Sequence, residues 1–458
     1  MQDISRRLAE YVAGTRFEDL SIEAVASARR STLDTLGCMA AGSSAPGIGT
    51  LVELARGWGG REEATVVGFG HRVPAPVAVW CNGSMARALE IDDCVDFLPV
   101  HPSASAVPAL LAVSELRGGL SGRDFLTALA VGQDVKIRMG LAVRQNAMES
   151  GRNNLFKIFG PAAAVARALG LDPDRTQHAL GIAFSHAVGD GQCALDGALS
   201  LRLQQGIVAQ GALLSGLLAE RGFTGARDFL LGKYGYLRAF EPEPRLEYLL
   251  EGLGRRFYGE QITLKPYSSC RATHAAIELA LRWREEAGGK LDGLRAVTVR
   301  VTPEVDRLVG SPREARLRPD SAPGAQFSLL YTVAAALARG RVFLDEIAPE
   351  AYTSETILQL AERVRVEPDP AMRTDLVVGR TEVTIEAEGQ PPWRQAVEHP
   401  LGGARRPLSP EACREKFLAA GAHCVRPLDP ARLKQIVEMT ARLEALDDVS
   451  HLARLLGG

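Results

Sequence analysis

The chain has 458 residues, with 53 Lys and Arg against 55 Asp and Glu and a formal net charge of −2 at pH 7. This near balance, without a long run of like charge, argues against nucleic acid or an anionic membrane surface as a partner. No segment reaches the roughly 18 uninterrupted apolar residues of a membrane span, and the N-terminal MQDISRRLAEYVAG lacks the apolar core of a secretory signal. We therefore expect a cytoplasmic protein whose partners are small molecules or a second copy of itself.

Most of the first half of the chain has the pattern of successive helices. The predicted helices cover residues 21–43, 74–91, 105–116, 122–143, 160–170 and 201–222. Ser21 has the character of an N-cap, with Glu23 in the first turn. Alanine-rich stretches such as PAAAVARALG allow close helix packing in a multi-helix bundle.

The pattern changes near residue 260. Valine-rich alternation predicts strands within 294–305, 362–369 and 377–389, and helices are expected at 272–286 and 325–340. The last stretch, at 409–421 and 430–458, is helical again. The sequence thus predicts a mainly α protein with a smaller α+β domain. The expected domains are 1–265 (helical), 266–400 (α+β) and 401–458 (the rest of the helical domain).

Several common signatures are absent from the sequence. It has no G-x-G-x-x-G after a strand, no G-x-x-x-x-G-K-[ST] and no G-x-S-x-G, which disfavours nucleotide, nicotinamide and acyl-serine chemistry. The seven cysteines are scattered and never spaced as C-x-x-C, which disfavours a disulfide framework, a zinc site and an iron–sulfur cluster. We expect no cofactor and no resident metal.

The stretch LEIDDCVDFLPVHPSAS combines acids with apolar residues that indicate burial. Its ionisable residues are Glu90, Asp92, Asp93, Asp96 and His101. If a helix continues to Cys94 and Pro102 opens the next one, His101 lies in the loop between them. Glu90 and Asp93 then share a helical face, whereas Asp92 points elsewhere and Asp96 lies in the loop. The alternative is that the acids cap helices and the histidine is a surface residue.

A second group of candidates lies in LKPYSSCRATHAAIELA. Lys265, Arg271 and His274 fall within ten residues, near the predicted domain junction. Cations at a helix N-terminus oppose the macrodipole, which favours a functional role such as binding a di- or tricarboxylate. The alternative is an ordinary basic helix start. In a third segment, ESGRNNLF, Asn153 precedes an apolar helix and has the character of a cap.

Taken together, these segments resemble the MmgE/PrpD family, whose members include 2-methylcitrate dehydratase, cis-aconitate decarboxylase and iminodisuccinate epimerase. The resemblance covers nearly the whole chain and is most specific at HPSA and KPYSSCRATHAAI. It implies a large helical domain built from both chain ends, an inserted α+β lid with the active site between the two, and a homodimer. It also implies a small polycarboxylate as substrate and chemistry without a cofactor.

The resemblance also implies roles for individual residues. The expected catalytic residues are Glu90, Asp93, His101 and Lys265, and the expected substrate contacts are Ser103, Asn153, Tyr267, Cys270, Arg271 and His274. Two positions depart from the family pattern. Arg152 and Asn153 stand where a G-F-H segment often carries its histidine, and Leu201 begins LRLQ where K-R-L is common.

Members of such a family share the problem of forming or quenching a carbanion beside a carboxylate. A base with a pKa near neutrality suits this task, and His101 is the natural choice, oriented by Asp93 or Glu90. Cations such as Lys265 would stabilise the enediolate. We therefore expect a lyase, a dehydratase or decarboxylase, acting on a small polycarboxylate.

Three other interpretations stay open at this point. The first is an epimerase or isomerase of a substituted succinate, which needs proton removal and return but no leaving group. The second is a metal-dependent hydrolase that uses Asp92, Asp93, Asp96 and His101 as ligands. The third is a non-catalytic helical homodimer that binds a carboxylate or a partner protein.

Overall fold

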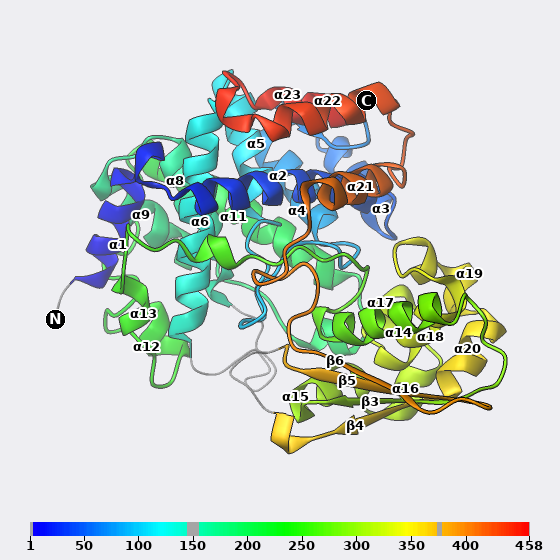
Figure 1. Ribbon diagram of the computed structural model, residues 1–458. Helices are drawn as coiled ribbons and strands as arrows, with labels where there is room; N and C mark the ends of the chain where they lie inside the picture. The colour runs from blue at the N-terminus through cyan, green and yellow to red at the C-terminus, as the bar shows by residue number, and fades with distance from the viewer. Residues whose placement is uncertain (1–2, 144–154, 373–377, 458) are drawn as a thin grey trace. The chain divides into compact units, whose positions relative to one another are not determined.

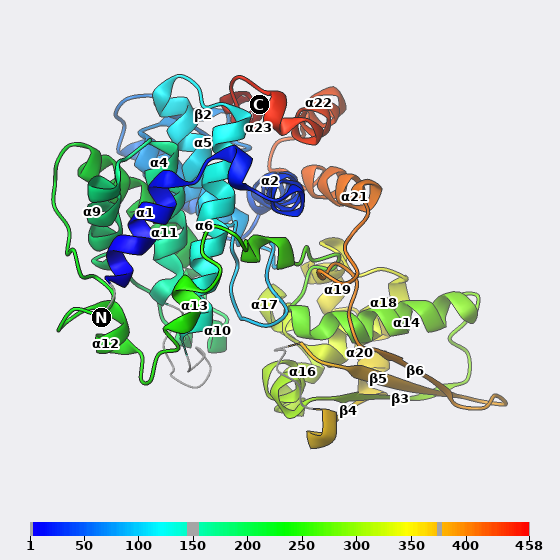
Figure 2. The same cartoon turned by 60° about the vertical axis from the view of Figure 1, so that its left-hand side comes forward.

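The structure, a computed structural model, describes residues 3–143, 155–372 and 378–457, with the backbone alone at residues 194 and 195. Contacts between residues divide the chain into two compact units, whose elements are labelled in Figures 1 and 2. Unit 1 contains residues 1–88, 100–262 and 410–458, and unit 2 contains residues 89–99 and 263–409. Each unit is therefore assembled from separate parts of the chain. The sequence-based domain boundaries at residues 265 and 400 stay a prediction.

The described part of unit 1 is helical apart from one short hairpin. Its helices of eight or more residues are α1 (Ile4–Gly14), α2 (Ile22–Gly42), α3 (Ile48–Gly57), α4 (Ala75–Ala86), α5 (Ala106–Arg117), α6 (Gly122–Ala142), α8 (Phe159–Ala168), α9 (Pro173–Phe184), α11 (Ser200–Glu220), α21 (Pro410–Gly421), α22 (Pro430–Ala441) and α23 (Ser450–Gly457). Shorter helical segments are η1 (Phe17–Asp19), η2 (Leu155–Ile158), α10 (Gln192–Leu195), α12 (Tyr236–Phe240), α13 (Glu247–Leu250), η3 (Tyr258–Gln261) and η8 (Leu443–Ala445). The antiparallel hairpin of β1 (Ala64–Val66) and β2 (His71–Val73) was not predicted, because three-residue strands are too short to show an alternating pattern.

Small residues let α6 and α8 pack backbone against backbone. A Cβ atom at Gly132 would lie 2.7 Å from the Cβ of Ala164, and one at Gly160 would lie 2.5 Å from the Cβ of Lys136. Real side chains do not approach so closely, so glycine is required at both positions. The predicted close packing of the alanine-rich segment is confirmed, and Lys136 is held at the contact between the two helices.

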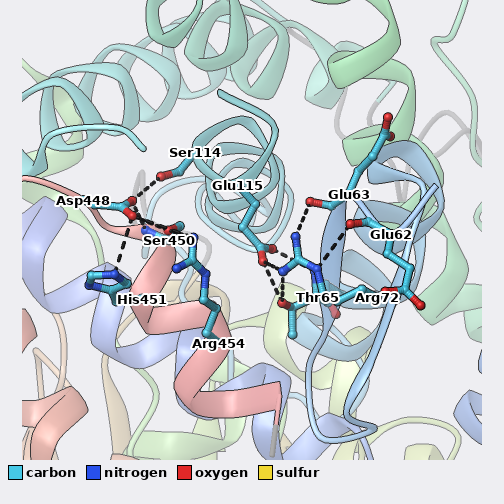
Figure 3. A network of polar contacts seen from close by, with 11 residues as sticks. Glu62, Glu63, Thr65, Arg72, Ser114, Glu115, Asp448, Ser450, His451 and Arg454 are labelled. Atoms are coloured by element: carbon cyan, nitrogen blue, oxygen red, sulfur yellow. Dashed lines mark hydrogen bonds and ion pairs between the residues drawn. The ribbon is translucent and has the colours of Figure 1, made fainter. Parts of the chain in front are cut away.

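Two groups of polar contacts attach the hairpin and the last helix to α5 (Figure 3). Buried Glu115 accepts hydrogen bonds from the backbone N–H of Thr65 at 2.8 Å and from Arg72 at 2.6 Å. Asp448 accepts from the hydroxyl of Ser114 at 3.1 Å and from the backbone N–H of Ser450 at 2.8 Å. Because both groups connect secondary structure elements of one unit, we assign them a structural role.

The pKa of Asp448 leads us to expect that the fold loses part of its stability at low pH. Burial raises the pKa of Asp448, but the hydroxyl and N–H of Ser450, the hydroxyl of Ser114 and the charge of His451 lower it more, so the net pKa lies below its ordinary value. A lowered carboxyl pKa stabilises the folded state above the unfolded pKa, and this stabilisation is lost as the pH falls through the folded one.

We expect Asp448→Asn to lower the Tm at pH 7, with the difference from wild type shrinking below about pH 4. Thermal melts of both proteins between pH 3 and pH 7 measure this. A difference that stays constant over the whole range would contradict the assignment.

Unit 2 is an α+β unit. Its strands are β3 (Leu294–Val301), β4 (Val364–Pro368), β5 (Thr381–Ala387) and β6 (Trp393–Val397). Its helical segments are η4 (Arg271–Thr273), α14 (His274–Glu286), α15 (Pro303–Val305), η5 (Asp306–Gly310), α16 (Arg313–Leu317), α17 (Ala322–Gln326), α18 (Leu329–Arg339), η6 (Asp345–Ile347), α19 (Pro349–Tyr352), α20 (Glu355–Glu362) and η7 (Pro370–Met372). The predicted fold class, mainly α with a smaller α+β portion, is confirmed.

The strands form one sheet in the order β4-β3-β5-β6, in which only the β3–β4 pair is parallel. Alternate residues of β3, namely Val297, Val299 and Val301, are fully buried, as the period-two pattern predicted. Helices α14 and α18 pack on the sheet, as Figure 1 shows. The edge strand β6 was not predicted, because only Val397 of its five residues is buried and the strand gives no clear alternation.

Candidate active site

The acidic segment does not continue the preceding helix. Helix α4 ends at Ala86, and Glu90 has a left-handed backbone with φ 55°. The carbonyl of Leu89 accepts hydrogen bonds from the hydroxyl of Ser268 and the amide of Gln326, both at 2.8 Å. The predicted helix through Cys94 is therefore wrong, because contacts with distant parts of unit 2 replace the helical hydrogen bonds. A non-glycine residue at positive φ costs about 1–2 kcal/mol, and such strain is typical of functional sites.

Lys265 lies against two of these acids in the interior of unit 2. Its Nζ is 2.8 Å from Oε2 of Glu90 and 3.9 Å from Oδ1 of Asp92. The side chains are 1% exposed for Lys265, 6% for Glu90 and 1% for Asp92. The expectation that Asp92 points elsewhere is wrong, since it assumed helical spacing where the backbone is not helical. Asp93 is also buried, with 1% exposed.

Burying the charged groups of Lys265, Glu90 and Asp92 together costs free energy. Removing a carboxylate or an ammonium group from water costs several kcal/mol per ion, which only close pairing offsets. The lysine and the paired carboxylate come from positions 175 residues apart, so the whole unit must fold to form the pair. Buried charged groups of this kind mark candidate reaction sites.

Arg271 is held by protein acceptors on all sides. Its Nε and Nη2 bond the carboxylate of Asp96 at 2.8 and 3.1 Å, and its Nη atoms also donate to the carbonyls of Pro400 and Leu401 at 2.9 and 2.7 Å. A Cβ atom at Gly403 would lie 2.6 Å from Asp96, so the 400–403 turn fits closely around this pair. The bidentate geometry is the strongest that arginine forms with a carboxylate. It favours a role in holding the acidic segment, and substrate binding by Arg271 stays a prediction.

The neighbouring candidates are packed with Arg271. His274 is fully buried, with Nδ1 3.3 Å from Nη1 of Arg271 and Nε2 3.3 Å from the carbonyl of Ser269. Since arginine only donates, Nδ1 accepts from Arg271, which places a ring proton on Nε2, facing the carbonyl of Ser269. The ring of Tyr267 lies 5.1 Å from that of His274, and burial, the largest effect, raises the pKa of Tyr267 to about 12. Tyr267 is therefore a hydroxyl donor at neutral pH, and Cys270 is buried beside this group.

His101 and Ser103 lie in unit 1. Lys136, on α6, donates from Nζ to the carbonyl of His101 at 2.7 Å and to the hydroxyl of Ser105 at 3.0 Å. Ser103 accepts from the amide of Gln133 at 2.8 Å. The predicted helix start at Pro102 is wrong, since α5 begins at Ala106. The lysine ammonium holds this segment in an irregular path, and the half-buried His101 belongs to it.

The sequence also missed functional candidates. Lys136 and Lys157 are 1% and 3% exposed. In the sequence Lys136 lies between Asp134 and Arg138, and Lys157 is a single charge in an apolar run, so neither differs from a surface lysine in its local pattern. A lysine on the alanine- and glycine-rich face of a predicted helix was the available signal for Lys136. Asn153 lies outside the described residues. At the other departure from the family pattern, half-buried Leu201 lies in the first turn of α11.

The described residues hold neither a metal-binding cluster nor a helix that could cross a membrane. No group of three or more His, Cys, Asp or Glu side chains in residues 3–143, 155–372 and 378–457 is arranged to hold a metal ion. Over the same ranges, no helix combines the length and apolar character needed to cross a membrane. The seven cysteines are all free and buried.

Comparison with known proteins identifies the family. The MmgE/PrpD N-terminal domain matches residues 6–249, and the MmgE/PrpD C-terminal domain matches residues 267–442. The chain belongs to the MmgE/PrpD family. The resemblance seen in the sequence is confirmed.

Named relatives of this MmgE/PrpD protein align along nearly their whole length. A cis-aconitate decarboxylase-like protein of Aspergillus oryzae is 27% identical, covering 100% of this chain and 98% of its own. The cis-aconitate decarboxylase of Aspergillus terreus is 27% identical over 99% of this chain and 96% of its own. That of Mus musculus is 26% identical over 100% and 94%. Family and relatives together support a lyase-type function.

Proposed function

We propose that the protein is a cofactor-independent lyase that removes CO2 from a small di- or tricarboxylate through an enediolate-type carbanion. The observation that carries this proposal is the buried Lys265, paired with Glu90 at 2.8 Å beside Asp92. The names of the relatives, cis-aconitate decarboxylases, support decarboxylation of a tricarboxylate as the reaction. Dehydration, the other reaction expected from the family, is the first alternative.

The reaction needs stabilisation of negative charge. When the bond between carbon and CO2 breaks, its electron pair passes into the adjacent carboxylate system, and a proton is then added to carbon. In our proposal the Lys265 ammonium lies at the oxygens that gain charge. Its position is set in advance by Glu90, so little reorganisation is needed during the reaction. A single preorganised donor of this kind contributes on the order of 10²–10³ in rate.

We assign the transfer of the proton to carbon to His101. Its backbone is held by Lys136, while its side chain is only half-buried and so accessible to a substrate. We assign Asp93 or Glu90 as the partner carboxylate that orients or exchanges the proton. Ser103, Asn153, Tyr267, Cys270, Arg271 and His274 keep their proposed role as substrate contacts.

A turnover screen tests this function. We would incubate the protein with cis-aconitate, 2-methylcitrate, iminodisuccinate and substituted succinates in D2O, and follow CO2 release and proton NMR. The expected result is CO2 release with one deuterium on the new C–H carbon, abolished in His101→Gln at unchanged Tm. Loss of water without release of CO2 would show that the reaction is a dehydration and not a decarboxylation.

An epimerase is the second candidate, favoured by Asn153 and Leu201 at the positions where the family often has histidine and lysine. An epimerase removes and returns a proton without a leaving group and therefore needs fewer catalytic groups. In the same screen, deuterium exchange at the α-carbon with an unchanged carbon skeleton would establish it and exclude the lyase.

We also propose a homodimer. Large apolar side chains are exposed on or next to two helices that pack against α4. Leu54 of α3 and Trp58, directly after α3, are 51% and 58% exposed, and Leu199, directly before α11, and Ile207 of α11 are 47% and 37% exposed. Grouped exposed apolar residues are typical of contacts between proteins. Sedimentation velocity measures the assembly directly, and a monomer at all concentrations would contradict it.

A further inference from the structure

Lys157 is a buried amine with a neutral hydrogen-bond partner. It lies in η2 of unit 1, with 3% of its surface exposed, and its Nζ donates to Oε1 of Gln204 at 2.8 Å. An ammonium group has three hydrogens to donate. Among residues 3–143, 155–372 and 378–457, no carboxylate forms an ion pair with Lys157. A buried cation that has only an amide oxygen as partner is poorly compensated.

The surroundings of Lys157 disfavour its charged form. Burial is the largest effect, and Lys136 of α6 and Arg87 after α4 add repulsion, while Cys193 and Asp190 oppose it. Together they lower the pKa of Lys157 to about 7. Near neutrality the side chain is therefore divided between amine and ammonium.

Gln204 is fixed as an acceptor. Its Nε2 donates to the carbonyl of Asp190 at 2.9 Å and lies 3.0 Å from Sγ of Cys193. These contacts assign the amide nitrogen to that side, so the oxygen faces Lys157. Lys136, the cation that lowers the pKa of Lys157 most, also donates a hydrogen bond to the carbonyl of His101. Within unit 1, Lys136 therefore acts on Lys157 through its charge and on the segment of His101 through a hydrogen bond.

We propose that Lys157 binds a carboxylate of the substrate and takes up a proton as it does so. The proposal rests on the proposed function in that it takes a polycarboxylate as the ligand. A bound carboxylate supplies the negative charge that Gln204 does not, and it would also attract the charges of Lys136 and Arg87, against repulsion from Asp190. An opposite charge at hydrogen-bond distance favours the ammonium form, so binding and protonation are coupled.

The direction of the pH effect follows from this coupling. Well below pH 7 Lys157 is already protonated, and binding takes up no proton. Above pH 7 each binding event must also protonate the amine, so the affinity for the carboxylate falls as the pH rises. Proton uptake grows over the same range toward one proton per site.

Calorimetric titration tests the proposal with tricarballylate, a saturated tricarboxylate, at pH 8 in buffers of different protonation enthalpy. We expect wild type to take up most of one proton per site. Lys157→Arg, which stays charged, should bind without uptake, and Gln204→Glu, which gives Lys157 an internal carboxylate, should also lose uptake. Lys157→Met should bind about 10- to 100-fold more weakly, with the exposed Lys434→Met as the unchanged control.

Several outcomes would overturn the inference. These are binding by wild type without proton uptake, the same uptake in Lys157→Arg and Gln204→Glu as in wild type, or no binding of tricarballylate. Failure of the proposed function looks different: uptake depends on Lys157, but no polycarboxylate is turned over. If the protein turns over its substrate with release of CO2 but proton uptake does not depend on Lys157, the inference is wrong and the proposed function stands.

Discussion

Lys265→Met is expected to lower the free energy of unfolding by about 3–5 kcal/mol and the turnover by at least about 100-fold. The substitution keeps a side chain of similar length but leaves Glu90, at 2.8 Å, and Asp92, at 3.9 Å, as buried carboxylates without their ammonium partner. Urea unfolding measures the first effect. Turnover at low temperature, where the variant is still folded, measures the second.

Two controls separate pairing from general damage. In Glu90→Gln/Lys265→Met the uncompensated charge at Glu90 is also removed, so we expect the double variant to regain part of the stability while turnover stays lost. Arg295→Met breaks a pair with Glu388 in which both side chains are mostly exposed, 65% and 69%, and should cost less than about 1 kcal/mol. A Lys265→Met variant as stable as Arg295→Met would contradict the burial of the cluster.

Arg138→Met is expected to destabilise unit 1 by a similar amount, about 3–5 kcal/mol. Arg138 and Asp134 are both 0% exposed and pair at 2.6 Å within α6. The guanidinium also donates to the carbonyls of Glu251 and Arg256 at 2.7 and 2.9 Å, and Asp134 accepts from the hydroxyl of Tyr11 at 2.9 Å. Loss of Arg138 therefore leaves a buried carboxylate and buried carbonyls without their donor.

The pH dependence gives this prediction a second readout. Burial already raises the pKa of Asp134, although Arg138 lowers it, so removal of the arginine raises it further. A raised carboxyl pKa in the folded state lowers stability increasingly as the pH rises above the unfolded pKa. We therefore expect Arg138→Met to be less destabilised at pH 5 than at pH 8. Arg175→Met, which breaks an exposed pair with Asp172, is the control and should show no such difference.

The regular elements were predictable because their patterns are local. The long helices α2, α6 and α11 and the strands β3 and β5 follow from apolar spacing, and their ends agree with the prediction within a few residues. The path of the acidic segment was not predictable in this way. Its backbone is set by Ser268 and Gln326, which lie 179 and 237 residues from Leu89 in sequence.

The residues of the candidate site likewise include some that the sequence predicted and some that it missed. Glu90 and Lys265 were chosen from the sequence, and the structure brings them together. Asp92 was set aside on helical spacing that does not apply there. Lys136 and Lys157 were missed because the local sequence around each does not distinguish a buried lysine from an exposed one. Lys136 packs against Gly160 of a neighbouring helix, and Lys157 bonds Gln204, 47 residues away in sequence, neither of which a local pattern shows.

The grouping of Leu89–Pro99 with unit 2 has a consequence for synthesis of the protein on the ribosome. Glu90 is translated 175 residues before Lys265, and Asp96 is translated 175 residues before Arg271. At a translation rate of about 5–20 residues per second, the acidic residues are synthesised roughly 10–35 s before their cationic partners. During that interval they remain hydrated in the nascent chain, and a release of the chain before residue 265 leaves the segment with neither Lys265 nor Arg271.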